Sequence, residues 1–384
     1  MAGGALDARD RGRGSRLHGV RSIGVEEEYL LVDGQGVPTG VADAAVRAFE
    51  RSGGEQDPTP GGGLEHELQE QQVETGTPPR VDLADVAEEV RAGRRRASDA
   101  ALAADARLVA LATSPLPGPT TLTHGARYEA IAQAYALTVR EQLTSGCHVH
   151  VAVADDDEGV AVLDRIGPWL PTLLALSANS PYWRGEDSGY ASIRAQRWNQ
   201  WPTAGPTAVF GSAAAYRGAV EGLVSSGVAL DAGMIYFDAR LSQRYPTVEL
   251  RVADVCLRAD DAVLVAALSR ALVETAAREA ADGVPPAVQR VEPLRAATWR
   301  AARSGLAGDL LVPPSMTPVP ARDAVVALLD HVRPALVDAG DLTTVQDLLA
   351  RLWERGTGAD EQRGWARDGG LPAVVEQAVA ATLA

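Results

Sequence analysis

Cysteine is scarce in this sequence, since Cys147 and Cys256 are the only two among 384 residues. Two cysteines cannot supply a disulfide framework, and no charged, apolar and small-residue leader opens the chain. The most apolar stretch, 163–178, is broken by Asp, Arg and two Pro residues. It therefore lacks the ~20 uninterrupted apolar residues of a membrane helix. We expect a reduced, cytoplasmic protein without a membrane span.

Positive charge is also scarce, because 36 basic residues stand against 51 acidic ones and the formal net charge is −15. Nucleic acids and anionic membranes are bound by concentrated Lys and Arg, so this balance argues against both as partners. A nucleotide-binding loop of the Walker type is missing too, because the triple glycine at 61–63 is followed by Leu-Glu instead of Lys-Ser/Thr. A local basic site for phosphate remains compatible with the sequence.

Periodic patterns predict the main elements of the fold. Residues 1–18 are rich in Gly, Arg and Asp, which predicts a disordered tail. Strand patterns occur at 22–32, 64–75, 109–113, 145–153, 233–241 and 246–255. Helical patterns occur at 41–51, 83–105, 126–138, 261–280, 292–306, 321–338, 342–355 and 371–383. Residues 180–211 are expected to form a long loop, and 19–384 a single α+β domain.

Four of the predicted strands carry polar side chains at alternating positions. Alternate strand residues share a face and lie ~7 Å apart, while their neighbours point to the opposite face. The pairs that share a face are Glu26 with Glu28, Gln72 with Glu74, His148 with His150, and Glu249 with Arg251. Apolar residues occupy most of the opposite positions. If the polar faces converge, the sheet carries a cavity rich in carboxylates.

Clustered carboxylates repel one another unless cations lie between them, and hard oxygen ligands suit Mg²⁺ or Mn²⁺. Arg251, with Arg194 or Arg240 from other segments, would supply positive charge for a phosphoryl group. Any single Glu-x-Glu or Glu-x-Arg pair is more typical of a solvated strand face. The pair His148-x-His150 alone is typical of a hydrogen-bonded strand pair or of a zinc site.

The same residues lie in blocks that resemble the bacterial carboxylate–amine ligases of glutamate–cysteine ligase family 2, the YbdK-like group. The blocks follow one another from about residue 20 to 365: GVEEEYLLVD (24–33), ELQEQQVETGTPP (67–79), SGCHVHVAV (145–153), 174–206, IYFDARLSQRYPTVELRVADV (235–255) and GTGADEQR (356–363). The resemblance implies a glutamine-synthetase-like fold, in which a curved antiparallel sheet is backed by helices and the C-terminal third is helical.

The resemblance also implies roles for individual residues. The expected metal ligands are Glu26, Glu28, Glu67, Glu74, His148 and Glu249. Arg251 is expected to face the phosphate, with Arg240 and Ser192 near the nucleotide. Arg194 is expected beside the substrate carboxylate or phosphate. ATP and Mg²⁺, with Mn²⁺ as a substitute, are the implied cofactors, amino acids the implied substrates, and a homodimer the implied assembly.

The reaction implied by the resemblance joins glutamate to cysteine. The γ-carboxylate would attack the γ-phosphate of ATP to give an acyl phosphate, and an amine would then displace phosphate. Three alternatives stay open: a ligase that uses another carboxylate or amine, a zinc hydrolase built on His148 and His150, and a nucleotide-binding regulator without turnover. Cys147 is expected in the core, because it alternates with His148. Neutralising Glu249 is expected to leave the metal-free protein equally stable or more stable.

Overall fold

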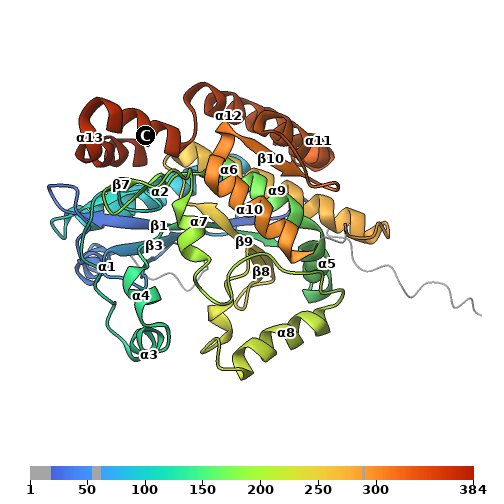
Figure 1. The fold of residues 1–384 in the computed structure, drawn as a ribbon, viewed down its shortest axis with the longest axis horizontal. Helices are drawn as coiled ribbons and strands as arrows, with labels where there is room; N and C mark the ends of the chain where they lie inside the picture. The colour runs from blue at the N-terminus through green and yellow to red at the C-terminus, as the bar shows by residue number, and fades with distance from the viewer. Residues whose placement is uncertain (1–18, 54–61, 288–289) are drawn as a thin grey trace, which may run out of the picture.

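The computed structural model describes residues 19–53, 62–287 and 290–384, so the predicted tail at 1–18 lies outside it. At its centre is a seven-stranded antiparallel sheet with the order β2-β3-β1-β5-β9-β8, in which β4 also pairs with β1 (Figure 1). The strands are β1 (Ile23–Val32), β2 (Leu64–His66), β3 (Gln72–Gly76), β4 (Arg107–Val109), β5 (Gly146–Ala152), β8 (Ala239–Leu241) and β9 (Thr247–Asp254). The strand β1 is therefore central, with a partner on each side.

Helices cover both faces of this sheet. Figure 1 shows α9 (Ala259–Ala281), α10 (Val291–Ser304), α11 (Ala321–Ala339) and α12 (Leu342–Arg355) above it. Below it lie α3 (Ala126–Tyr135), α4 (Leu137–Glu141) and α8 (Ala213–Ser225). The remaining helices are α1 (Ala42–Arg51), α2 (Leu83–Leu102), α5 (Asp156–Ile166), α6 (Leu170–Ser177), α7 (Ile193–Trp198) and α13 (Gly358–Thr382), and short 3₁₀ turns lie at Gly167–Trp169, Ala232–Met234 and Gly305–Ala307.

The main core lies between the sheet and α9. Valines on one face of β5 and β9 pack against this helix, which is apolar on almost every side and buried along most of its length. An α-helix that is hydrophobic all round requires burial on all sides, which explains its place between the sheet and the C-terminal helices. This packing leaves the opposite face of the sheet to the polar residues of the strands.

The middle glutamate of β1 belongs to the core face. Glu27 is buried and accepts hydrogen bonds from Nε of Arg94 (3.1 Å) and from the Tyr29 hydroxyl (2.8 Å). Arg94 is 1% exposed and also donates to the carbonyls of Cys256 and Leu257. This buried pair ties β1 to α2 and to the segment that follows β9, while Glu26 and Glu28 face the other way.

Several elements depart from the sequence predictions. Only Ala239–Leu241 of the predicted strand 233–241 pairs with β9, because the chain before it forms a 3₁₀ turn and then bridges to Gly205. The predicted loop 180–211 contains α7 and a two-strand hairpin, β6 (Tyr182–Trp183) with β7 (Glu186–Asp187). A second hairpin, β10 (Asp309–Val312) with β11 (Thr317–Pro320), interrupts the helical C-terminal third.

One stretch among the described residues, Asp156–Ser177, is long and apolar enough to cross a membrane by length and composition alone. It comprises α5 and α6, and 72% of its most apolar window is buried inside the protein. The core helix of a soluble protein has the same properties, so this stretch is weak evidence for a membrane span.

Candidate active site

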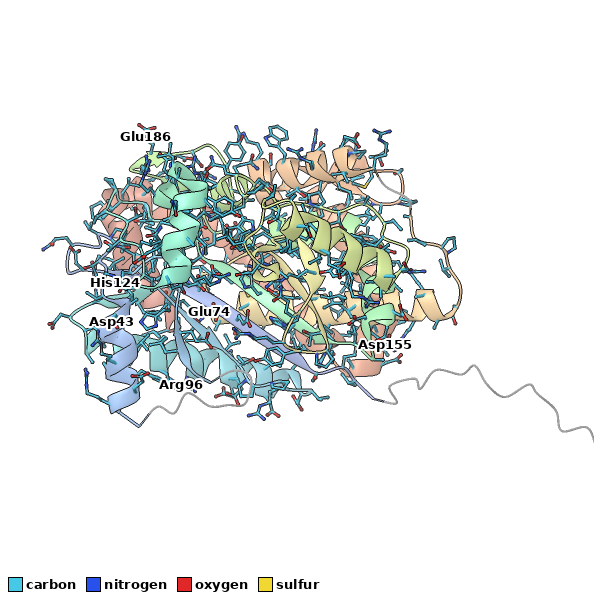
Figure 2. All side chains as sticks on the ribbon, turned by 90° about the horizontal axis from the view of Figure 1, so that it is seen from below. Asp43, Glu74, Arg96, His124, Asp155 and Glu186 are labelled. Carbon is cyan, nitrogen blue, oxygen red and sulfur yellow. The ribbon has the colours of Figure 1, made fainter. Side chains whose placement is uncertain are left out.

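Strand register brings the predicted polar pairs onto one surface. Glu26 lies opposite His148, Glu28 lies opposite Glu74, and in the next strand pair His150 lies opposite Glu249. Residues directly opposite one another in an antiparallel sheet share a face, so these side chains all point the same way. They line a cavity of about 580 Å³ on the sheet. Glu74, one of these residues, is labelled in Figure 2.

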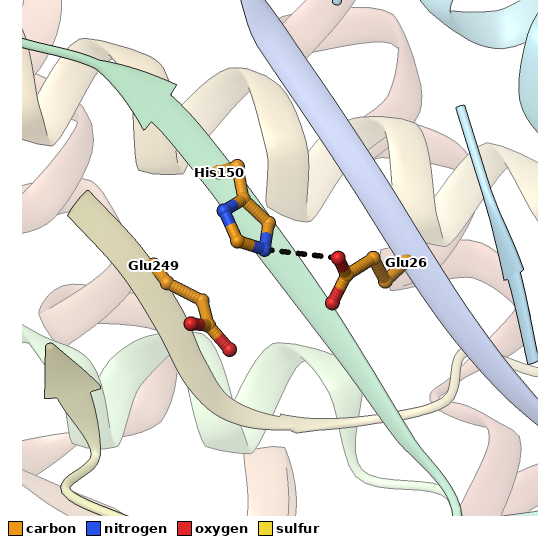
Figure 3. Close-up of side chains that lie close together, drawn as sticks. All are labelled: Glu26, His150 and Glu249. Atoms are coloured by element: carbon orange, nitrogen blue, oxygen red, sulfur yellow. Dashed lines mark ion pairs between the residues drawn. The ribbon is translucent and has the colours of Figure 1, made fainter. Parts of the chain in front are cut away.

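The first acidic group in this cavity consists of Glu26, His150 and Glu249, from three adjacent strands. Each residue offers one ligand atom, and these atoms all lie within 4.8 Å of one another. His150 Nε2 lies 3.2 Å from Oε1 of Glu26, and Glu249 approaches from the other side (Figure 3). The family resemblance implied a metal-ligand role for His148 only, and His150 was expected as a ligand only in the alternative of a zinc hydrolase.

The second acidic group consists of Glu28, Glu67 and Glu74, whose nearest oxygens also lie within 4.8 Å of one another. Glu67 comes from the turn between β2 and β3, and the structure brings it to the strands as expected. Glu28 accepts a hydrogen bond of 2.6 Å from the backbone N–H of Gly146. His148 stands between the two groups, with Nδ1 3.5 Å from Glu26 and Nε2 3.7 Å from Glu28.

The two groups differ in charge. Burial and the nearby Glu67 raise the pKa of Glu28 to about 7, and burial with Glu26 and Glu67 nearby raises the pKa of Glu74 well above its ordinary value. Burial alone would also raise the pKa of Glu26, but His150 and His148 hold that pKa well below its ordinary value. The second group therefore lacks the positive charge that would keep all of its carboxyls ionised.

The two histidines differ in charge. Burial alone would lower the pKa of His150, but the carboxylate of Glu26 raises it above its ordinary value. Burial and the neighbouring Arg251 lower the pKa of His148 to about 4, so its imidazole is neutral. Within the described part of the chain, Nε2 of His148 is buried without a hydrogen-bond partner, whereas Nε2 of His150 lies 3.2 Å from Glu26. Buried polar atoms are rarely left unpaired, so this unpaired atom and the crowded carboxyls fit a site for divalent cations.

Two arginines hold Glu249 in its place. Nε of Arg240 donates to Oε2 of Glu249 at 2.7 Å, and Arg251 pairs with the other carboxylate oxygen. Burial alone would raise the pKa of Glu249, but Arg251 and Arg240 hold it well below its ordinary value. Glu249 is thus an ion-pair partner as well as a candidate ligand. These ion pairs argue against our expectation that neutralising it would leave the metal-free protein at least as stable.

A β-bulge sets the position of Arg251. Val149 pairs with Leu250 and Cys147 with Ala253, so two residues of β9 stand opposite the single residue His148. Bulges bend a strand locally and change the direction of its side chains.

Cys147 is completely buried in the core layer, as the strand alternation predicted.

Ser192 and Arg194 are buried and do not line the cavity. Ser192 is completely buried, caps α7 by accepting from the N–H of Ala195, and donates to Asp254 at 2.8 Å. Arg194 is 2% exposed and donates weakly to the backbone carbonyls of Val252 (3.4 Å) and Arg251 (3.5 Å). In this geometry Ser192 positions the start of α7 against Asp254, and its contact with a nucleotide stays a prediction.

The family can be identified from the whole chain. A model described as "Glutamate-cysteine ligase family 2(GCS2)" matches residues 22–377. The chain belongs to glutamate–cysteine ligase family 2.

Curated members of family 2 resemble the chain over nearly their full length. A Streptomyces avermitilis protein, provisionally named glutamate–cysteine ligase 2-1, is 50% identical over 345 residues, which cover 90% of this chain and 94% of that protein. A Streptomyces coelicolor protein with a similar provisional name is 49% identical over 367 residues. This match covers 95% of this chain and 100% of that protein.

Solved structures confirm the predicted α+β, glutamine-synthetase-like fold. The glutamate–cysteine ligase of Francisella tularensis, solved with AMP, has a TM-score of 0.69 at 12% identity and covers 95% of this chain and 89% of that one. The bifunctional glutathione synthetase of Pasteurella multocida has a TM-score of 0.65 at 17% identity. The match covers 94% of this chain and 53% of the synthetase, so the family 2 chain spans about half of that structure.

One wall of the family 2 cavity consists of aromatic residues that the sequence pattern did not predict. Trp198 and Trp201 from α7 and the turn after it, together with Tyr236 before β8, line the cavity beside Arg251. The sequence signal was a pair of tryptophans three residues apart in a segment assigned to a loop. Tyr236 lay in a predicted strand whose first half does not form.

Proposed function

We propose that this protein is an ATP-dependent carboxylate–amine ligase that joins the γ-carboxylate of glutamate to an amine, with cysteine as the amine that the family name suggests. The observation that carries the proposal is the pair of acidic groups beside Arg251 in one cavity. A carboxylate-rich cavity repels both ATP and glutamate unless divalent cations lie between them. Membership in a ligase family supports the same reaction class.

The residues proposed to hold divalent cations are those of the two acidic groups, with His148 between them. Their donors are mostly carboxylate oxygens, which suits Mg²⁺ or Mn²⁺ better than a softer metal. When bound, these cations supply positive charge that neutralises the phosphates of ATP. A relative of the same fold was solved with AMP, which supports a nucleotide as the first ligand to test.

The proposed reaction has two steps. A γ-carboxylate oxygen of glutamate attacks the γ-phosphorus of ATP, the bond to the β-phosphate oxygen breaks, and ADP leaves. The lone pair of the amine then attacks the carbonyl carbon of the acyl phosphate, an amide bond forms, and phosphate and a proton leave. Arg251 is rigidly held by Glu249, so its guanidinium is positioned to follow the charge of the transferred phosphoryl group.

Hydroxylamine provides a test that does not depend on the identity of the amine. It is small and traps an acyl phosphate as a hydroxamate, so wild-type protein with Mg–ATP and glutamate is expected to release ADP and form glutamyl hydroxamate. EDTA is expected to abolish both signals, Mg²⁺ or Mn²⁺ to restore them, and a zinc-selective chelator to leave them intact. Turnover in EDTA without added metal would contradict the proposal. Recovery with Zn²⁺ alone would favour a zinc hydrolase.

A further inference from the structure

The bulge in β9 consists of Arg251 and Val252, which together stand opposite His148 of β5. A bulge leaves backbone groups of its extra residue without partners in the sheet and turns the nearby side chains. The N–H of Arg251 donates to the carbonyl of Asp238, which precedes β8, at 2.9 Å. The direction of the Arg251 side chain therefore depends on the contacts that hold this bulge in shape.

Arg194 contacts the bulge from α7. Its guanidinium donates long hydrogen bonds to the carbonyls of both bulged residues, at 3.5 Å to Arg251 and 3.4 Å to Val252. The guanidinium carbon of Arg194 lies 5.6 Å from the ring centre of Trp198, and that of Arg251 lies 5.9 Å from the same centre. A movement of the Arg194 side chain would thus reach Arg251 both through the backbone of β9 and through one indole ring.

The backbone of Arg194 is fixed by a buried acid. Its N–H donates to the hydroxyl of Ser180 at 3.1 Å, and this hydroxyl donates to Asp254 at 2.7 Å. Asp254 is completely buried, and its carboxylate lies 3.9 Å from Nη1 of Arg194, so it offsets part of the buried positive charge. The start of the Arg194 side chain is therefore held firmly, while its guanidinium depends on the carbonyls of the bulge.

Gly146 leaves the space that this guanidinium occupies. It lies opposite Asp254 in the sheet, and a Cβ at Gly146 would overlap Nη2 of Arg194 and lie 3.0 Å from the guanidinium carbon. The backbone of Gly146 is outside the left-handed region, so its conformation alone does not require glycine. The close approach of Arg194 is thus the reason that this position of β5 carries no side chain.

We propose that Arg194 is a positioning residue, which braces the β9 bulge across Gly146 and thereby aims Arg251 at the phosphoryl group. The inference rests on the proposed ligase reaction, in which Arg251 follows the charge of that group. It differs from the substrate contact that the family resemblance implied, because the Arg194 guanidinium donates to backbone carbonyls and does not line the cavity. Misplacement of a reacting group by about 1 Å can lower a rate about 100-fold, so loss of the brace should be visible in kcat.

Kinetics of glutamyl hydroxamate formation test the role of Arg194. In Arg194→Met, which loses the guanidinium but keeps an unbranched side chain, kcat is expected to fall at least about tenfold, while KM for ATP and for glutamate changes less than about threefold. Arg194→Lys is expected to recover part of the loss, because its ammonium can donate to one carbonyl, and it serves as the test if Arg194→Met does not fold. An unchanged kcat, with or without a raised KM, would overturn the proposal.

Gly146→Ala tests whether the guanidinium acts from the space beside this glycine. In the wild-type background the added methyl group is expected to displace the guanidinium and to lower kcat as far as Arg194→Met does. In the Arg194→Met background the methyl group meets no guanidinium, so kcat is expected to fall less than about twofold further. Equal losses in both backgrounds would mean that Gly146 acts independently of Arg194, and would overturn the proposal.

Amide hydrogen exchange of the ligand-free protein tests the brace without the ligase reaction. Peptides that span β9 are expected to exchange at least about tenfold faster in Arg194→Met and Gly146→Ala than in wild type. Gly24→Ala is the matched control, because Gly24 lies on the cavity face of β1 and its added Cβ would meet no atom closer than 3.7 Å, so exchange in β9 should not change.

The two kinds of measurement fail separately. Unchanged exchange of β9 in both Arg194→Met and Gly146→Ala would overturn the brace, even in a protein that forms the hydroxamate. A wild-type protein that forms no hydroxamate overturns the ligase reaction and the aim of Arg251 in it, whereas faster exchange in the variants would still show that Arg194 holds the bulge.

Discussion

Replacing Glu28 with glutamine tests the electrostatics of the second acidic group. In the metal-free protein, burial and the nearby Glu67 raise the pKa of Glu28 from 4.5 to about 7. A carboxyl with a raised pKa in the folded state gives its full contribution to stability below pH 4.5, and this contribution is lost as the pH rises through 7. The loss amounts to about 3 kcal/mol at pH 8, since a tenfold change in proton affinity is worth about 1.4 kcal/mol.

Glutamine keeps the shape of the protonated carboxyl and does not ionise. In EDTA we therefore expect Glu28→Gln to unfold at nearly the same denaturant concentration as wild type at pH 5. At pH 8 its free energy of unfolding should exceed that of wild type by up to about 3 kcal/mol. Added Mg²⁺ should stabilise wild type and have less effect on the variant, because the variant has lost one negative ligand.

Glu249→Gln is the matched control, because it neutralises a carboxylate with the opposite shift of pKa. The change leaves Arg240 and Arg251 without their shared carboxylate, so stability should fall by about 3 kcal/mol at both pH values. Denaturant titrations of the three proteins at pH 5 and 8 measure both effects. A Glu28→Gln protein that is less stable than wild type at pH 8, with Glu249→Gln unchanged, would refute this description of the site.

Three further predictions concern the same cavity. Glu28 must lose its proton to bind a cation, so Mg²⁺ affinity should weaken about tenfold per pH unit below pH 7. Calorimetry measures this affinity, and a value that does not change from pH 8 to 6 would contradict the raised pKa of Glu28. Arg251→Lys keeps the charge but loses the planar fork toward Glu249, so kcat for ADP release should fall more than KM for ATP rises, and a change in KM alone would argue for a binding role. Cys147→Ala should retain most turnover and lose about 1 kcal/mol of stability, whereas a folded but inactive variant would indicate thiol chemistry.

The alternation of side chains in strands explains how much of the site could be predicted. The spacing of Glu26 and Glu28, and of Glu249 and Arg251, determines which face each residue occupies once the segment is a strand. The valines of β5 and β9 are buried in the core, so the face that carries them must point toward it. The polar residues that alternate with them must then lie on the opposite face. The fold class and the convergence of these residues were therefore accessible from local pattern together with the family resemblance.

Other parts of the site depend on contacts between distant segments. The partners of His150 follow from the register between β5 and β9 and from the bulge opposite His148, which local pattern does not encode. Ser192 is buried because α7 forms and ties it to Asp254, 62 residues later. The aromatic wall of the cavity combines Trp198 and Trp201, from α7 and the turn after it, with Tyr236, so no single stretch of sequence contained it.

The three consecutive glutamates of β1 leave this strand no freedom to slide along its neighbours. Glu26 and Glu28 face the cavity, while Glu27 is buried against Arg94 on the core side. If β1 slipped by one residue, Glu27 would be the one glutamate of this strand that faces the cavity. Glu26 and Glu28 would then both point toward the single buried guanidinium of Arg94. The sequence of the segment would be unchanged, but both the cavity face and the core face would lose their contacts. Deletion of one residue within β1 should therefore harm this protein far more than most substitutions in this strand.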